Sequence, residues 1–282
     1  MRVLAEFIMR GRLQACLVGV FVPFVSVSTI GLVTLRKGAS EGSLVSLWVI
    51  LPLLLSYMFS AAIPFMAVVS GVALINIALV ANAHRVTADW NSSLGAATVS
   101  GIVLVCLAGL FFQADLNDFV NESEERLATA SEQTGLTMLA LTRNGVLAFF
   151  AWVVIFNTVI GLVLARWWQA LLYNPGGFQK EFHMLRLSPK LSLVCLVIFI
   201  TGLALGGNYQ LWLSLASIPI LIGGIAIVHC VVQHKSLSLW VLVGMYLGLF
   251  LFGPLLMVLL GALGAADSVM NFRTRLADDN QS

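Results

Sequence analysis

The residues of this sequence that could do chemistry are uncharged polar side chains inside long apolar stretches. Asn76 lies in the stretch 62–83, and Asn157 and Thr158 lie in the stretch 145–168. A carboxamide both donates and accepts hydrogen bonds, so these side chains could hold a small polar solute. They could equally satisfy one another through hydrogen bonds between helices. The sequence leaves both interpretations open.

Three further polar residues follow one another at the junction of two apolar stretches, namely Asn208, Tyr209 and Gln210. They could cap a solute pocket from one side of a membrane, although tight turns favour such residues in any case. Counted from residues 62 and 145, Asn76 and Asn157 lie 14 and 12 residues into their stretches. At 1.5 Å per residue these depths differ by only about 3 Å. These six polar residues are therefore the candidate substrate-binding residues.

Other chemistry is not indicated. No Asp, Glu, Lys or Arg lies in the middle of an apolar stretch, and no motif for nucleotide, dinucleotide or catalytic zinc binding occurs. The four cysteines are widely separated and lack metal-ligand spacing. The net charge of +2 comes without a Lys/Arg tract, unlike the basic surface of a nucleic-acid binder. We expect no enzyme activity, no catalytic residue, no metal, no cofactor and no nucleic-acid partner.

The elements that position the polar residues must be membrane helices. Hydrophobic residues make up 60% of the 282 residues and charged residues 10%, whereas soluble domains carry roughly a quarter charged residues. Apolar runs long enough to cross a hydrocarbon core of about 30 Å recur along the chain, and in lipid such runs must be helices. We expect an all-α, polytopic transmembrane helical bundle that forms a single integral membrane domain over residues 1–282. About eight apolar segments are expected, at 13–35, 43–58, 62–83, 95–114, 145–168, 191–206, 210–231 and 237–261.

The first segment leaves two arrangements open. Pro23 interrupts the helical hydrogen-bond ladder, so 13–35 is either one span or a broken helical hairpin that returns to the side it entered from. We favour the hairpin because it gathers cationic residues on the cytoplasmic side, as the positive-inside rule requires. Eleven of the fifteen Lys and Arg residues then lie inside, namely Arg2, Arg10, Arg12, Arg36, Lys37, Arg85, Arg166, Lys180, Arg186, Lys190 and Lys235.

Residues 115–135 form an acidic segment with helical periodicity. Its apolar residues Leu116, Phe119, Val120 and Leu127 share one helical face, and Glu122 with Arg126 has the spacing of an ion pair. We expect an extracytoplasmic amphipathic helix on the membrane surface, with a lid or a docking helix as the alternative.

Residues 171–190 form a basic segment in which Phe178, Phe182 and Leu185 recur at helical spacing. We expect a cytoplasmic interfacial helix whose cations face anionic lipid headgroups, with partner docking as the alternative. This orientation places the tight turns expected at 57–64 and 206–210, together with the C-terminal tail, on the opposite side from the basic segment.

Four short motifs of the sequence are Leu35-Arg36-Lys37-Gly38, Ala165-Arg166-Trp167-Trp168-Gln169, Asn174-Pro175-Gly176-Gly177-Phe178 and Leu185-Arg186-Leu187. With these motifs the chain resembles the YybS-like family of predicted bacterial multi-pass membrane proteins, whose function is unknown. That family is distantly similar to the S components of energy-coupling-factor transporters, which bind vitamins or metal ions and work with a separate ATPase module. Arg36 and Gly38 carry the shared Arg-x-Gly, whereas the chain has more spans than those proteins and no vitamin-binding signature.

Together these observations predict a multi-pass protein of the bacterial cytoplasmic (inner) membrane. We expect a small-solute binding or transport component that depends on a separate energising partner, such as another membrane protein or an ATPase module. The alternative is a non-transporting membrane scaffold or assembly factor. The lipid bilayer is the expected partner in both cases.

Overall fold

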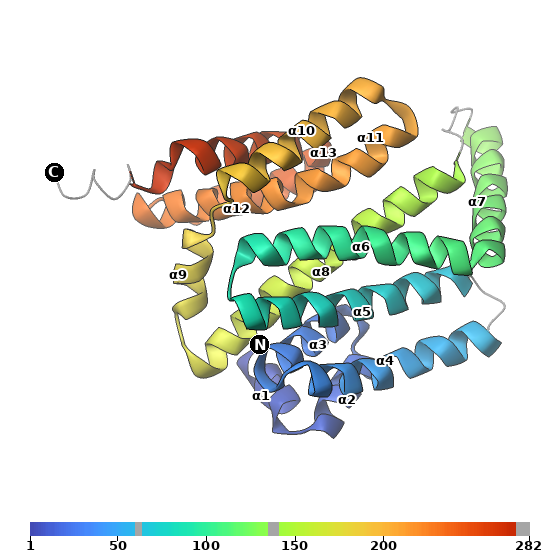
Figure 1. Ribbon diagram of the computed structural model, residues 1–282, viewed down its shortest axis with the longest axis horizontal. Helices are drawn as coiled ribbons and strands as arrows, with labels where there is room; N and C mark the ends of the chain where they lie inside the picture. The colour runs from blue at the N-terminus through green and yellow to red at the C-terminus, as the bar shows by residue number, and fades with distance from the viewer. Residues whose placement is uncertain (60–63, 135–140, 275–282) are drawn as a thin grey trace. The chain divides into compact units, whose positions relative to one another are not determined.

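The protein is all-helical in the computed structural model, which describes residues 1–59, 64–134 and 141–274 (Figure 1). No strand occurs among these residues. The helices are α1 (Arg2–Arg10), α2 (Arg12–Phe21), α3 (Pro23–Lys37), α4 (Ala39–Phe59), α5 (Pro64–Thr87), α6 (Trp90–Phe111), α7 (Gln113–Thr134), α8 (Arg143–Tyr173), α9 (Gly177–Met184), α10 (Pro189–Leu205), α11 (Gly207–Leu213), the 3₁₀ turn η1 (Ser214–Ala216), α12 (Ser217–His234) and α13 (Trp240–Met270). The predicted all-α fold is confirmed.

Six helical segments in the described part of the chain are long and apolar enough to cross a membrane. They are α4, α5, α6, α8, the segment Tyr209–His234 and α13. A seventh arises if α9 and α10, which are bent by 63° to each other, count as one span. The polytopic character is confirmed, but the count of eight is not, because the first expected segment consists of two short helices.

The chain divides into two compact units. Unit 1 comprises Met1–Ala88 with Val99–Leu172, and unit 2 comprises Asp89–Thr98 with Tyr173–Ser282. Both contain apolar helices, so the single membrane domain expected over 1–282 stays a prediction. Each unit is described by itself below.

The first apolar stretch of unit 1 is broken at its proline. α2 ends at Phe21, Val22 leaves the helical conformation (φ −124°, ψ 74°) and α3 begins at Pro23. One straight helix would hold Arg12 and Lys37 about 37 Å apart. Instead, Arg12 Nε donates to Glu41 Oε2 at 2.7 Å, and Glu41 follows Lys37 closely in sequence. The two ends of the stretch therefore lie at the same end of unit 1, as the hairpin requires, and a single straight span is wrong.

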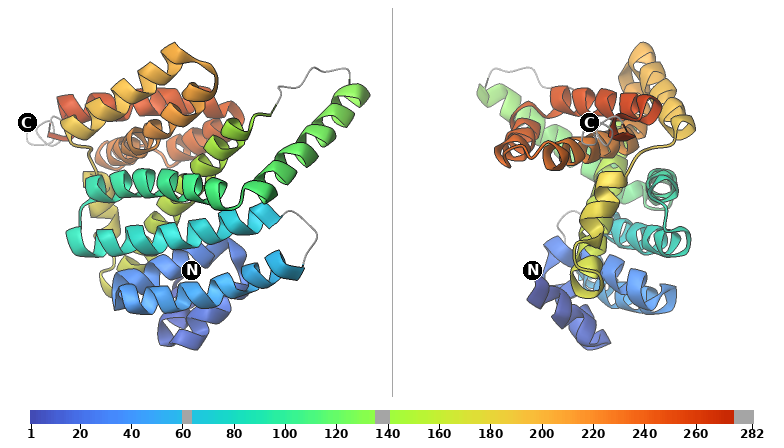
Figure 2. Two further views of the ribbon diagram at one scale, coloured as in Figure 1. Left: turned by 45° about the vertical axis from the view of Figure 1, so that its right-hand side comes forward. Right: turned by 90° about the vertical axis from the view of Figure 1, so that its left-hand side faces the viewer.

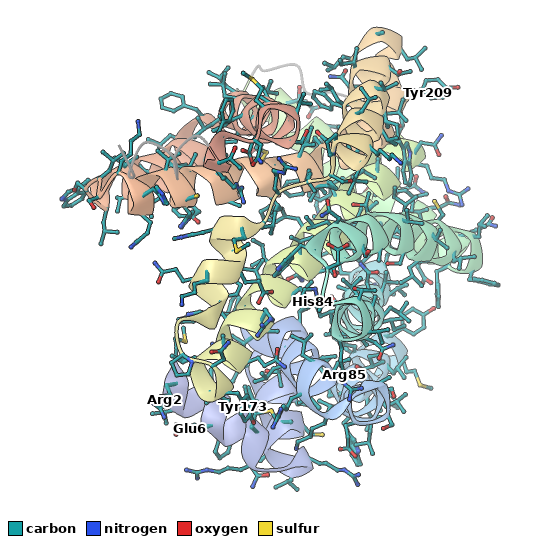
Figure 3. The ribbon with its side chains drawn as sticks, turned by 60° about the vertical axis from the view of Figure 1, so that its left-hand side comes forward. Arg2, Glu6, His84, Arg85, Tyr173 and Tyr209 are labelled. Carbon is teal, nitrogen blue, oxygen red and sulfur yellow. The ribbon has the colours of Figure 1, made fainter. Side chains whose placement is uncertain are left out.

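Cationic helix ends gather at this end of unit 1. Gly38 ends α3 with φ +100°, and a Cβ there would lie 2.7 Å from Arg85 Nη1 at the end of α5 (Arg85 is labelled in Figure 3). Near the end of α8, Gln169 Nε2 donates to the carbonyl of Leu35 at 3.5 Å, and Arg166 Nη1 donates to Gln169 Oε1 at 3.2 Å. The charge segregation that the sequence suggested is thus built into the packing of α3, α5 and α8.

The acidic helix α7 lies at the other end of α5 and α8 (Figures 1 and 2). Leu116 is fully buried, and the Phe119 ring contacts Phe65 at 6.2 Å and Phe150 at 5.3 Å between centroids. The predicted Glu122–Arg126 ion pair is present at 2.6 Å. The apolar face of the expected amphipathic helix thus packs on unit 1 itself. This arrangement favours a docked helix over one that floats on lipid.

Helix α13 of unit 2 is sharply kinked near Pro254, and Phe252 has non-helical dihedral angles (φ −117°, ψ 19°). In a straight helix Tyr246 and Gly264 would be about 27 Å apart. Yet Tyr246 Oη lies 2.8 Å from His229 Nε2, and a Cβ on Gly264 would meet the Ile220 carbonyl of the same α12. Both halves of α13 therefore pack on one stretch of α12.

The basic helix α9 lies at the same end of unit 2 as the chain segment after α13. Phe182 contacts His229 with ring centroids 5.5 Å apart, and Arg273 Nη1 donates to the carbonyl of His183 at 2.7 Å. We expected the C-terminal tail on the opposite side from the basic segment. That expectation is wrong as far as Arg273, because the kink turns α13 back.

Candidate functional site

Two of the predicted site residues satisfy each other inside unit 1. Asn76 in α5 is fully buried, and its Nδ2 donates to Thr158 Oγ1 of α8 at 3.0 Å. Ser100 of α6, which the sequence analysis missed, donates from Oγ to Asn76 Oδ1 at 2.6 Å. Hydrogen bonds of this kind join helices where no water is available. The group Asn76–Ser100–Thr158 therefore ties α5, α6 and α8 together.

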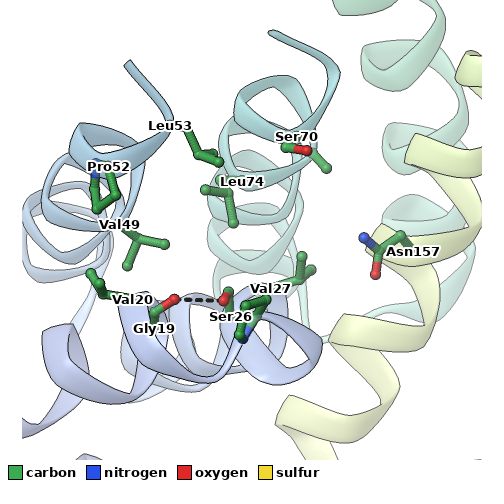
Figure 4. A pocket seen from close by; sticks show the side chains of 12 residues that line it. Gly19, Val20, Ser26, Val27, Val49, Pro52, Leu53, Ser70, Leu74 and Asn157 are labelled. Atoms are coloured by element: carbon green, nitrogen blue, oxygen red, sulfur yellow. Dashed lines mark hydrogen bonds between the residues drawn. The ribbon is translucent and has the colours of Figure 1, made fainter. Parts of the chain in front are cut away.

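Asn157 is the neighbour of Thr158 but faces elsewhere, because successive helical residues are turned by about 100°. Its side chain lines a cavity of about 210 Å³ within unit 1, shown close by in Figure 4. α2, α3, α4 and α5 supply the other walls, through Gly19, Val20, Pro23, Ser26, Val27, Val49, Pro52, Leu53, Ser70, Ala73 and Leu74. Neither Asn76 nor Thr158 is part of this lining.

The break between α2 and α3 shapes the cavity. Pro23 has no N–H, so the Gly19 carbonyl four residues earlier loses its helical donor. Ser26 Oγ donates to this carbonyl at 2.6 Å instead, as the dashed line in Figure 4 marks. Pro52, which lies inside the continuous helix α4, lines the same cavity. Irregular backbone at membrane depth is tolerated where it is buried in protein or lines a cavity.

The Asn157 carboxamide is the available polar group of this site. α8 has 31 residues from Arg143 to Tyr173, so Asn157 lies about 21 Å from its start, close to the middle of the span. No hydrogen bond to this amide occurs among the described residues. An unpaired amide in an apolar medium costs several kcal/mol. Its two donors and its acceptor are therefore free for a ligand.

The other predicted site residues belong to unit 2. Gly206 and Gly207 turn the chain with positive φ values, and Tyr209 and Gln210 follow in α11 rather than in a tight turn. Tyr209, labelled in Figure 3, is 67% exposed. The side chain of Asn208 lies outside the described residues. The cavity around Asn157 is lined by unit 1 alone, so nothing described brings these residues to it.

A polar cluster that the sequence analysis missed closes the end of α13. Asp267 is buried, Arg273 Nε lies 3.2 Å from its Oδ2, and the Phe272 N–H donates to its Oδ1 at 3.1 Å. Burial lowers the pKa of Arg273, whereas the carboxylate of Asp267 acts to raise it. The sequence signal for this cluster was Asp267, an isolated acidic residue after the last apolar stretch. Its contacts are those of a structural tie between α13 and α9.

These features define an α-helical, multi-pass membrane protein with a partly polar cavity in unit 1. Its apolar helices imply a lipid environment. In the described part of the chain, no group of three or more His, Cys, Asp or Glu side chains is placed to hold a metal ion. Comparison with known protein families, with curated proteins and with solved structures found no match.

Proposed function

We propose that the protein binds a small, uncharged, hydrogen-bonding solute in the cavity of unit 1, with Asn157 as the principal polar contact. The observation that carries this proposal is an amide at the middle of a membrane span that faces a cavity and has no described hydrogen-bond partner. Such a group is costly unless a ligand or water pairs with it. Asn76 and Thr158 then act on the site by fixing α8 against α5.

The lining restricts the class of solute. Apart from Asn157, the side chains that contribute polar atoms are Ser26 and Ser70, and their hydroxyl groups already donate to the Gly19 and Met66 carbonyls. An ion would lack a countercharge, which is expensive at membrane depth. An apolar cavity of about 150 Å³ holds benzene, so about 210 Å³ suits a compact neutral solute of one or two rings. The proposal includes no enzymatic step, so the bound solute is released without chemical change.

The broken helix favours a transport component. Discontinuous helices line the substrate sites of many secondary transporters, and here the α2–α3 break lines the cavity. Because the sequence has no nucleotide-binding motif, active uptake would need a separate energising partner in the bacterial cytoplasmic membrane. This proposal agrees with the resemblance to YybS-like proteins and, distantly, to S components.

A thermal-shift screen of the purified protein in detergent tests the proposal. The panel contains uncharged vitamins, nucleobases and nucleosides, and mass spectrometry checks that a bound compound is recovered unaltered. A ligand at a hundred times its Kd stabilises the folded state by about 2.7 kcal/mol, and Asn157→Leu should abolish that gain. Gln210→Leu makes the same chemical change on an exposed helix of unit 2 and should keep it.

The competing function is a membrane scaffold, which the mutual pairing of Asn76, Ser100 and Thr158 favours. A scaffold would show no stabilising ligand, and Asn157→Leu would leave growth and protein partners unchanged. A compound that stabilises Asn157→Leu as strongly as the native protein would contradict the proposed site.

A further inference from the structure

Unit 1 carries a second hollow, an apolar groove between α2 and α4. It has a volume of about 510 Å³ and is lined by Arg12, Leu13, Cys16, Leu17, Val20, Phe21, Leu44 and Trp48. Several of these side chains are open to the surroundings: Leu13 is 69%, Phe21 75% and Trp48 56% exposed. Measured along α2, the groove extends about 14 Å from Arg12 to Phe21. It is therefore a long apolar groove with a cationic residue at one end.

The cationic end has hydrogen-bond donors to spare. Arg12 binds Glu41 through Nε and Nη2, which uses two of the five N–H groups of a guanidinium. No partner of the other three occurs among the described residues. Lys37 lies close enough to Glu41 to attract its carboxylate, so the charge of Lys37 adds to that of Arg12. Exposed Arg10 precedes α2 by two residues. Arg12 and Lys37 thus act on one carboxylate, which leaves this end of the groove with a net positive charge.

We propose that this groove binds one anionic phospholipid of the surrounding bilayer, with an acyl chain along Leu13, Leu17 and Phe21 and the phosphate on Arg12. A groove of about 510 Å³ and about 14 Å in length has room for one acyl chain over the depth of one leaflet, which is about half of a 30 Å hydrocarbon core. Cationic side chains at the membrane surface attract anionic headgroups.

A protein occupant fits the groove less well. Stable protein interfaces use about 20–30 residues on each side, whereas eight residues line this groove. The small apolar lining and the cationic end instead match one lipid, whose headgroup stays at the surface while its tail lies in the groove. The groove shares Val20 with the solute cavity, but the inference does not depend on the function proposed for that cavity.

Native mass spectrometry of the full protein, released from detergent with added lipid, tests this inference. The probes are phosphatidylglycerol and phosphatidylcholine with identical acyl chains. We expect one phosphatidylglycerol molecule to remain bound preferentially. Arg12→Gln should weaken its binding about fivefold, the equivalent of about 1 kcal/mol for one cation near the membrane surface. Arg126→Gln is the matched control, because Arg126 is also an exposed arginine paired with a glutamate.

A steric variant covers the case in which Arg12→Gln fails to fold. Leu17→Trp fills the groove without a change of charge and should weaken binding of both lipids. Leu193→Trp on the exposed face of α10 should leave binding unchanged. The inference is overturned if the native protein shows no preference for phosphatidylglycerol. It is also overturned if Arg126→Gln loses as much binding as Arg12→Gln, if Leu17→Trp binds lipid normally, or if the native protein is a dimer that Leu17→Trp dissociates.

Discussion

Asn76 and Thr158 are 82 positions apart in the sequence and share a hydrogen bond of 3.0 Å in the interior of unit 1. Thr158 therefore serves the packing of α8 on α5, while its neighbour Asn157 faces the cavity. Two adjacent polar residues that look equivalent in sequence thus have different surroundings. Substitutions at the two positions should have different effects.

Asn76→Leu should destabilise the protein without direct loss of a ligand contact. The change leaves the hydroxyl groups of Thr158 and Ser100 without Asn76, and a buried polar group without its partner costs about 1–3 kcal/mol. Unfolding in mixed detergent measures the effect. Asn157→Leu removes no described hydrogen bond and should be neutral or stabilising. Equal destabilisation by the two variants would contradict the assignment.

Gly224→Ala should weaken the packing of α12 on α13. A Cβ at Gly224 would lie 1.9 Å from the Leu260 carbonyl oxygen, which is backbone and cannot turn aside. Overpacking of this kind costs typically about 1–3 kcal/mol, so a lower Tm is expected. Gly244→Ala in α13 is the control, because no atom lies within 4 Å of the corresponding Cβ. A Tm for Gly224→Ala equal to that of the control would refute the close contact.

The N-terminus of α6 should lose stability in acid. Partial burial by itself raises the pKa of Asp89, but hydrogen bonds from Ser92 and Asn91 outweigh it and hold that pKa below its usual value. A lowered folded-state pKa means stability that is present above the unfolded pKa of about 3.9 and is lost as pH falls through the folded pKa. Asp89→Ala should cost about 1 kcal/mol at neutral pH and flatten the stability profile below about pH 4. Hydrogen exchange at the start of α6 reports the change, and a profile as steep as that of the native protein would speak against this cap.

The acidic segment around Glu125 and the basic segment around Lys180 should be accessible from opposite sides of the membrane. Single cysteines in a background without the four native ones, at Glu125, Lys180 and Thr274, can be labelled in intact cells with an impermeant maleimide. The positive-inside rule predicts labelling at position 125 from outside and protection at 180. The backfolded α13 predicts that 274 behaves like 180, since Arg273 contacts His183. Labelling of 274 together with 125 would argue against the fold of α13.

Periodicity and proline predicted much of this fold. Apolar runs must be helices in lipid, so the spans follow from composition, and Pro23 located the break in the first stretch. The Glu122–Arg126 pair was predictable because it is local in sequence. The hydrogen-bond partners of Asn76 could not be predicted from sequence spacing alone, because Thr158 and Ser100 belong to other helices.

The fold of α13 shows the limit of such reasoning. Residues 237–261 read as one span because every residue is compatible with lipid, and Pro254 does not by itself give the angle of a kink. The contacts of Leu260 and Gly264 with α12 decide it. Tyr209 and Gln210 were expected beside the solute on the basis of residue type, which carries no information on which helices pack together.

Val20 lines both the solute cavity and the lipid groove. The two hollows therefore meet at one isopropyl group, and the Asn157 side chain is itself exposed in the middle of its span. We expect a compound dissolved in the bilayer to reach the amide from the hydrocarbon phase without re-entering water. Uptake should then follow partition coefficients more closely than aqueous concentrations.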